Sequence, residues 1–127
     1  MRKSLSIYGG WGFLYTNVDP KLLEGSIVAG PSYVFGHNEK AQAFERLFIE
    51  QYKVPPNFDA AFAYEVVKNI VRVMKLRQQD DPKSLKRGLV ALGTVQGVVG
   101  NYRFDEQGNM IIETSVGIMR NGQISKP

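Results

Sequence analysis

The most regular pattern of apolar and polar positions in this chain lies between residues 57 and 78. Apolar side chains recur there every three or four positions and charged ones recur opposite them, which predicts an amphipathic helix from Asn57 or Phe58 to about Gln78. The side chains expected to face the core are Ala60, Ala63, Val66, Val67, Ile70, Val71 and Met74, and those expected to face solvent are Lys68, Arg72 and Lys75.

Capping signals predict two further helices. Asn38 precedes a run with apolar side chains at helical spacing, so a helix capped by Asn38 is expected over 39–52. Its expected buried stripe is Ala43, Phe44, Leu47 and Phe48. Asp81 before Pro82 is a helix-start signal, and Gly93 is expected to end that helix. The side chains spaced for burial on it are Leu85, Leu89 and Leu92.

Strand signals precede these helices. Residues 5–8 predict a short strand that ends at Gly9-Gly10, where the backbone can approach a ligand closely. Residues 26–29 predict a second strand, which Gly30-Pro31 stops because proline cannot continue a central ladder. The segment 14–23 between the two strands is expected to be a short, interrupted helix.

Further strand and turn signals follow the last helix. Gly108-Asn109 predicts a turn, and residues 110–119 predict one strand. Asn121-Gly122 is a tight-turn signal that favours positive φ at both positions. The alternation of helices and strands indicates an α/β protein.

Composition and charge narrow the function. The chain has 127 residues, of which 43% are hydrophobic and 22% charged, and this fits one compact domain with a sizeable core. It has no apolar run long enough to span a membrane, and the apolar stretch after Met1 is shorter than that of a signal peptide. The formal net charge is +4, but the basic side chains of residues 68–87 follow a solvated helix face, so no nucleic-acid partner is expected.

Residues that could carry catalysis or bind metal are sparse. The absence of cysteine excludes disulfides, thiolate metal sites and cysteine catalysis. His37 is the sole histidine and is interpreted as a surface loop residue. The carboxylate pairs Asp80-Asp81 and Asp105-Glu106 stand at a helix start and a turn, where such side chains have structural roles. We therefore expect no enzyme, no metal and no cofactor.

An ordered set of short motifs resembles the type I periplasmic solute-binding family, whose best-known branch binds leucine, isoleucine and valine. The matching pieces are Gly9-Gly10-Trp11-Gly12, 23–28, 44–52, 59–67, Asp81-Pro82, 97–100, Phe104-Asp105, Gly108-Asn109 and Gly122. They cover nearly the whole chain in family order. The family usually has Tyr-Asp where this chain has Tyr64-Glu65.

The resemblance implies a three-layer α/β fold with a mostly parallel sheet, of which this chain would be a C-terminal fragment. In the family two lobes close around a buried ligand. Residues 1–29 and 115–127 would be part of the second lobe, and residues 30–114 would complete the first. Most of both lobes and the signal peptide would then lie outside this chain.

The resemblance also implies which residues bind ligand. The expected contacts are Tyr8, Gly10 and Trp11 from the second lobe, and Phe58 and Asp59 from the first. Trp11 could cover an apolar part of the ligand, or it could be buried against Leu22 or Ile27. Asp59 could meet a ligand ammonium group, or it could serve as a first-turn carboxylate favoured by the helix dipole.

The implied function is the capture of a small solute, such as an amino acid, for delivery to an ABC permease in the membrane. The full-length parent would be periplasmic or extracytoplasmic. The alternatives are a sensory or regulatory ligand-binding domain of the same fold and an α/β enzyme domain. Because a fragment leaves packing faces uncovered, we expect an exposed patch that supports a dimer. The expected members of the patch are Trp11, Ile27, Val116 and Ile118.

Overall fold

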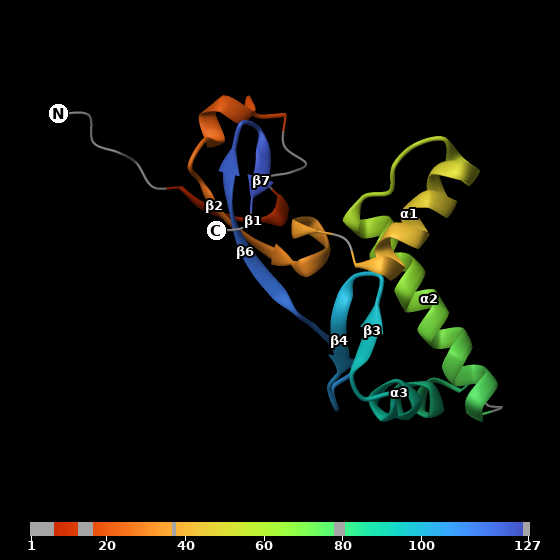
Figure 1. The fold of residues 1–127 in the computed structure, drawn as a ribbon. Coiled ribbons are helices and arrows are strands. Elements are labelled where there is room, and N and C mark those ends of the chain that lie inside the picture. The colour runs from red at the N-terminus through yellow and green to blue at the C-terminus, as the bar shows by residue number, and fades with distance from the viewer. Residues whose placement is uncertain (1–6, 13–16, 37, 78–80, 126–127) are drawn as a thin grey trace. The chain divides into compact units, whose positions relative to one another are not determined.

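A computed structural model describes residues 7–12, 17–36, 38–77 and 81–125 (Figure 1). The chain divides into two compact units. The first unit combines Met1–Gly36 with Thr114–Pro127, and the second is the continuous segment His37–Glu113. No helix in the described residues is long and apolar enough to cross a membrane.

A four-stranded sheet forms the first unit, in the order β1-β2-β6-β7. Its strands are β1 (Tyr8–Gly10), β2 (Ile27–Pro31), β6 (Thr114–Arg120) and β7 (Gln123–Ser125). Two short 3₁₀ helices, η2 (Pro20–Leu23) and η3 (Ser32–Phe35), flank β2. β1 and β2 are parallel, whereas the β2–β6 and β6–β7 pairs are antiparallel. The mostly parallel sheet expected for the fold is thus represented among the described strands by the β1–β2 pair.

Close packing and a tight turn fix this sheet. Asn121 and Gly122 have φ values of 52° and 76°, so the expected turn with positive φ at both positions is confirmed and joins β6 to β7. A Cβ at Gly117 would lie 2.4 Å from Ile124 and 2.7 Å from the Phe35 ring, so only glycine fits there. Val28, fully buried, lies at the centre of this small core.

Three expectations for the first unit need correction. β2 continues to Pro31 instead of ending at residue 29; β1 pairs only with Ile27–Ala29, so the proline has a single neighbouring strand, β6. The helix expected over 14–23 is seen as the 3₁₀ helix η2, and residues 14–16 lie outside the described residues. Of the expected exposed patch, Val116 is exposed, while Trp11, Ile27 and Ile118 are partly buried.

The second unit packs three helices with an antiparallel three-stranded sheet in the order β3-β4-β5. The helices are α1 (Glu39–Tyr52), α2 (Phe58–Arg77) and α3 (Pro82–Ala91), and the strands are β3 (Val95–Gly97), β4 (Gly100–Phe104) and β5 (Met110–Ile112). The expected caps are confirmed: Asn38 accepts a hydrogen bond from the Ala41 amide, and Asp81 accepts one from the Ser84 amide.

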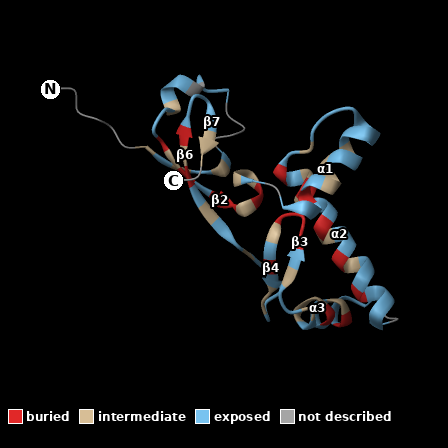
Figure 2. Ribbon diagram, in the orientation of Figure 1, coloured by how far each residue is buried: buried red, intermediate tan, exposed pale blue. Residues whose placement is uncertain are grey.

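The buried face of α2 differs from the expected one (Figure 2). Its buried side chains are Phe58, Ala61, Glu65, Asn69 and Val73. Val67, Val71 and Met74, expected in the core, are exposed instead. The reason is that residues of the β3–β4 hairpin supply hydrogen-bond partners for Glu65 and Asn69, so a stripe containing two polar side chains becomes the packed one.

Two smaller expectations for the second unit also change. Residues 110–119 do not form one strand: β5 and β6 belong to different sheets, and Glu113 separates them. On α3 the fully buried residues are Ser84 and Gly88, whereas Leu85, Leu89 and Leu92 are only partly buried. Gly88 is buried because α3 crosses α2 closely: a Cβ at Gly88 would lie 2.1 Å from the Val73 side chain.

Candidate functional site

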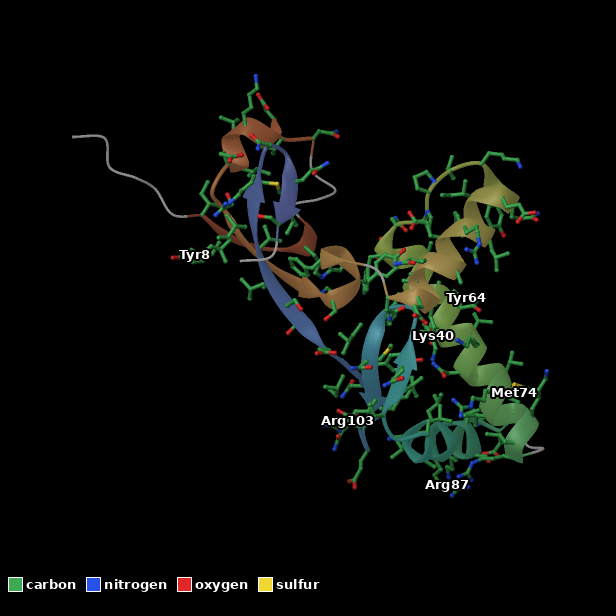
Figure 3. The ribbon with its side chains drawn as sticks, viewed as in Figure 1. Tyr8, Lys40, Tyr64, Met74, Arg87 and Arg103 are labelled. Carbon is green, nitrogen blue, oxygen red and sulfur yellow. The ribbon has the colours of Figure 1, made fainter. Side chains whose placement is uncertain are left out.

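The first group of expected ligand contacts lies at the end of edge strand β1. Tyr8 is exposed, with 69% of its surface accessible, and Gly10 is also exposed (Figure 3). Trp11 follows and is partly buried. Its side chain lies over β2, because a Cβ at Gly30 would be 2.8 Å from the Trp11 Cβ and 3.3 Å from its Cδ1. Gly30 therefore provides the space in which Trp11 packs.

The second group lies at the start of α2, in the second unit. The Asn57 side chain caps the helix by accepting a hydrogen bond of 2.9 Å from the Ala60 amide. Phe58 is buried, and its ring centre is 5.6 to 5.8 Å class contact distance, namely 5.7 Å, from that of Phe62. Asp59 is exposed in the first turn and has no ion-pair partner among the described residues. Each group thus sits in its own unit, and ligand contact by the five residues stays a prediction.

A buried carboxylate in the second unit is the most strongly connected polar group of the described residues. Glu65 is fully buried, and its carboxylate accepts hydrogen bonds from the Val98 amide at 2.7 Å and the Tyr102 hydroxyl at 2.5 Å. The Lys68 ammonium lies 3.3 Å away. Asn69 donates to the Tyr102 hydroxyl at 2.5 Å and to the Glu65 backbone carbonyl. These contacts tie α2 to the β3–β4 hairpin.

The same contacts set the ionisation of this group. Burial raises the pKa of Glu65, but hydrogen bonds from Tyr102 and Val98 and the charge of Lys68 outweigh burial, so the pKa lies below its ordinary value of 4.5. Burial, together with the hydrogen bond to Glu65, raises the pKa of Tyr102 above its ordinary value of 10.0. The pair therefore holds a carboxylate and a neutral phenol at neutral pH.

These pKa shifts predict a window of pH in which the second unit is most stable. The pKa of Glu65 is lower in the folded state, so its stabilisation is complete above about pH 5 and is lost as the pH falls through the folded pKa. The pKa of Tyr102 is higher in the folded state, so its stabilisation is complete below about pH 10 and is lost as the pH rises. Urea midpoints measured across pH should show a plateau with a fall at each end.

Two variants separate the contributions to this profile. Tyr102→Phe should lose most of the alkaline fall, and Glu65→Gln should reduce the acid fall. Some acid dependence should remain in Glu65→Gln, because the hydrogen bond from Asn109 lowers the pKa of Asp105. An alkaline fall of the same size in Tyr102→Phe would contradict this assignment.

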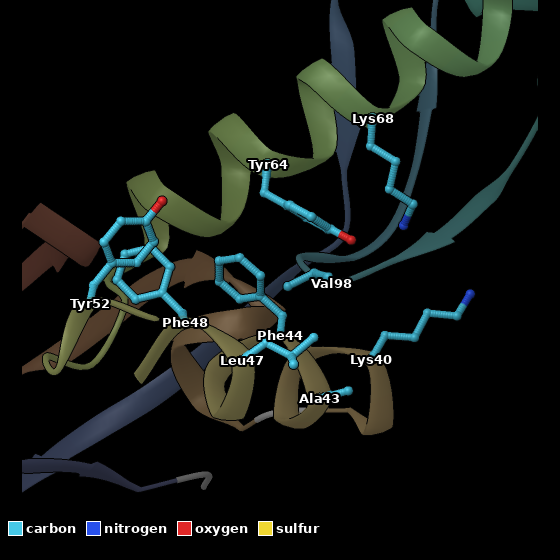
Figure 4. A pocket seen from close by; sticks show the side chains of 9 residues that line it. All are labelled: Lys40, Ala43, Phe44, Leu47, Phe48, Tyr52, Tyr64, Lys68 and Val98. Carbon is cyan, nitrogen blue, oxygen red and sulfur yellow. The ribbon is translucent and has the colours of Figure 1, made fainter. Parts of the chain in front are cut away.

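An aromatic groove between α1 and α2 was not anticipated from the sequence (Figure 4). Its volume is about 470 Å³. The rings of Phe44 and Tyr64 have their centres 4.9 Å apart, and those of Phe48 and Tyr52 are 4.5 Å apart. The lining residues are Lys40, Ala43, Phe44, Leu47, Phe48, Tyr52, Tyr64, Lys68 and Val98. The spacing of Phe44, Phe48 and Tyr52, four positions apart on one helix, was the available signal.

The cations at the groove are already engaged. Lys40 donates to the Gln96 carbonyl, and Lys68 pairs with Glu65 and lies 5.3 Å from the Tyr64 ring centre. The groove therefore offers apolar aromatic surface rather than free charge. No three His, Cys, Asp or Glu side chains within the described residues are grouped to hold a metal ion. His37 lies outside those residues.

Neither a scan against models of known protein families nor a search of curated proteins found a match. Solved structures do match. An ABC transporter substrate-binding protein from Desulfitobacterium hafniense in complex with Leu is 25% identical, with a TM-score of 0.77 over 96% of this chain and 35% of that chain. The substrate-binding protein LivJ from Streptococcus pneumoniae in complex with isoleucine is 22% identical, with a TM-score of 0.73 over 95% and 36%.

A third match is a putative branched-chain amino acid ABC transporter from Rhodospirillum rubrum. It is 22% identical, with a TM-score of 0.72 over 99% of this chain and 38% of that chain. This chain thus spans little more than a third of the length of each of the three proteins. The motif resemblance and the α/β class are confirmed by these matches. The chain has the type I periplasmic solute-binding fold of the leucine, isoleucine and valine-binding family, and it fits the C-terminal portion of that fold.

Proposed function

We propose that this chain is part of the solute-binding component of an ABC importer of the branched-chain amino acid type. The component captures a small solute such as an amino acid between two lobes and delivers it to a membrane permease. The observation that carries this proposal is the match of 96% of the chain to a substrate-binding protein in complex with Leu. The parent protein would act in the periplasm or otherwise outside the cytoplasm, and it would not be an enzyme.

The proposed mechanism is lobe closure driven by contacts that the ligand makes only in the closed state. The chain leaves the first unit after Gly36 and returns to it at Thr114, which supports two connecting segments of a hinge. The lobes inferred from the family, 1–29 with 115–127 and 30–114, assign residues 30–36 and Thr114 to the other side of this division. Phe35 packs against Gly117 of β6, which favours counting η3 with the first unit.

The five inferred contact residues would have different roles. Asp59 would bind the ligand ammonium group, since its carboxylate is exposed and has no ion-pair partner among the described residues. Trp11 would cover the apolar side chain, with Tyr8 and Gly10 beside it. Phe58 is buried, so it would position the first turn of α2.

The main alternative is a sensory or regulatory ligand-binding domain of the same fold, and an α/β enzyme domain is a weaker one. Genes for two permeases and two ATPases beside this one would favour transport. A neighbouring kinase gene would favour sensing, and an amidase operon would favour regulation of that pathway.

Calorimetric titration tests the proposal. A protein that contains these residues with the rest of both lobes should bind leucine, isoleucine, valine or a small aromatic acid such as benzoate. Asp59→Asn should weaken the binding of an amino acid by about tenfold to a hundredfold, because a charge-assisted hydrogen bond contributes roughly 1.5–3 kcal/mol. Glu39→Gln is the matched control, since Glu39 is the exposed first-turn carboxylate of α1.

The 127-residue chain alone is expected to bind no amino acid with micromolar affinity, because most of both lobes would be absent. Micromolar binding of leucine to the monomeric chain would contradict the proposal. Equal affinities of the Asp59→Asn and parent proteins would remove Asp59 from the site.

A further inference from the structure

Helix α2 carries a second apolar stripe on the side opposite its buried one. Tyr64, Val67, Val71 and Met74 are 45%, 61%, 43% and 37% exposed (Figure 3 labels Tyr64 and Met74). Large apolar side chains that line up on one exposed helix face usually mark a surface that packs against another element. The matched proteins are almost three times as long as this chain, so the described residues lack the layers that could cover such a face.

The spacing of the stripe suits another helix. The four residues are separated by three, four and three positions, which is the alternation of a and d positions in helices that pair side by side. The stripe is also bordered by Lys68 and Lys75, whose long stems can cover apolar surface while their charges stay in water. At 20 residues, α2 is about 30 Å long, enough to pair over three turns.

The charges at the ends of α2 favour an antiparallel pair. Asp59 lies in the first turn, and Lys75 and Arg77 lie in the last turn. An antiparallel partner of the same sequence would bring the acidic first turn of each helix beside the basic last turn of the other. The helix dipoles would then also oppose each other favourably.

We infer that this chain forms a dimer in which the Tyr64, Val67, Val71 and Met74 face of α2 packs antiparallel against the same face of a second copy. A second copy fits both the spacing of the apolar residues and the charges at the helix ends. The inference is independent of the proposed transport function. It places the dimer contact on the second unit, rather than on the patch expected from the sequence around Val116.

Sedimentation velocity on the 127-residue chain tests the inference. The parent chain should sediment as a dimer at micromolar concentrations. Val71→Lys should weaken the dimer at least about tenfold, because it places an unpaired ammonium group in the buried contact. Leu76→Lys is the matched control: Leu76 is on the same helix and 69% exposed but outside the stripe, so this variant should remain a dimer. Circular dichroism should show equal helix content in all three proteins.

Charge reversal tests the orientation. Asp59→Lys should weaken the dimer about threefold to tenfold, and adding Lys75→Glu should restore it, since the end charges are then exchanged. A monomeric parent chain, growth beyond the dimer, or a Val71→Lys protein that dimerises as well as Leu76→Lys would each overturn the inference. A monomer would leave the face to the missing layers of the fold.

Discussion

Replacing Glu65 with alanine is expected to unfold the second unit or bring it close to unfolding. The change leaves the Val98 amide and the Tyr102 hydroxyl without their buried acceptor and leaves a void between α2 and the β3–β4 hairpin. Removing one partner of a buried charged pair costs about 3–5 kcal/mol. Domains of this size are typically stable by only about 5–15 kcal/mol, so the expected loss is a large part of the total.

Urea unfolding followed by circular dichroism measures this loss. Glu65→Gln should cost less, about 1–3 kcal/mol, because the amide oxygen can still accept one of the two hydrogen bonds. Glu50→Ala, which removes an exposed carboxylate from α1, is the control and should change the free energy of unfolding by less than about 0.5 kcal/mol. A cost below about 1 kcal/mol for Glu65→Ala would show that the network does not hold the unit together.

The second large effect is expected for Gly88→Ala, where α3 crosses α2. Alanine favours a helix over glycine by about 1 kcal/mol, so an exposed site would be stabilised. At Gly88, however, the new Cβ would lie 2.1 Å from the Val73 Cγ1, and a valine in a helix has little freedom to rotate away. We expect a net loss of about 1–3 kcal/mol from overpacking.

Thermal unfolding of a double-mutant cycle checks this explanation. Val73→Ala alone should be destabilising, because Val73 is almost fully buried. In the Gly88→Ala background the same change removes the overlapping methyl group, so its cost should fall or vanish. A Gly88→Ala protein that is more stable than the parent would mean that the helices separate without loss.

The ends of the elements could be predicted because their signals are local. Asn38 and Asp81 accept hydrogen bonds from amides three positions later, and Asn121-Gly122 adopts its turn within two residues. Local sequence therefore predicted where α1, α2 and α3 begin. The division of residues 110–119 between two sheets depends on partners far away in the chain, such as Gly30 and Tyr102, and had no local signal.

The packing face of α2 could not be predicted, because the helix has two candidate faces. Val67 and Val71 made one face look like the core, whereas the other contains Glu65 and Asn69. Their partners, Val98 and Tyr102, lie about 33 residues further along the chain, beyond the reach of helical periodicity. The expected contact residues were judged from family resemblance, and in the sequence Glu65 stood out only as a departure from the family's Tyr-Asp.

The division of the first unit between the two ends of the chain affects how the protein folds during synthesis. The register of β2 with β6 pairs Val28 with Gly117, about 90 residues later. The second unit is continuous, so it can fold once residue 113 has left the ribosome. Strands β1 and β2 must wait for β6 and β7, so the growing chain exposes an unpaired strand edge until the last residues are made.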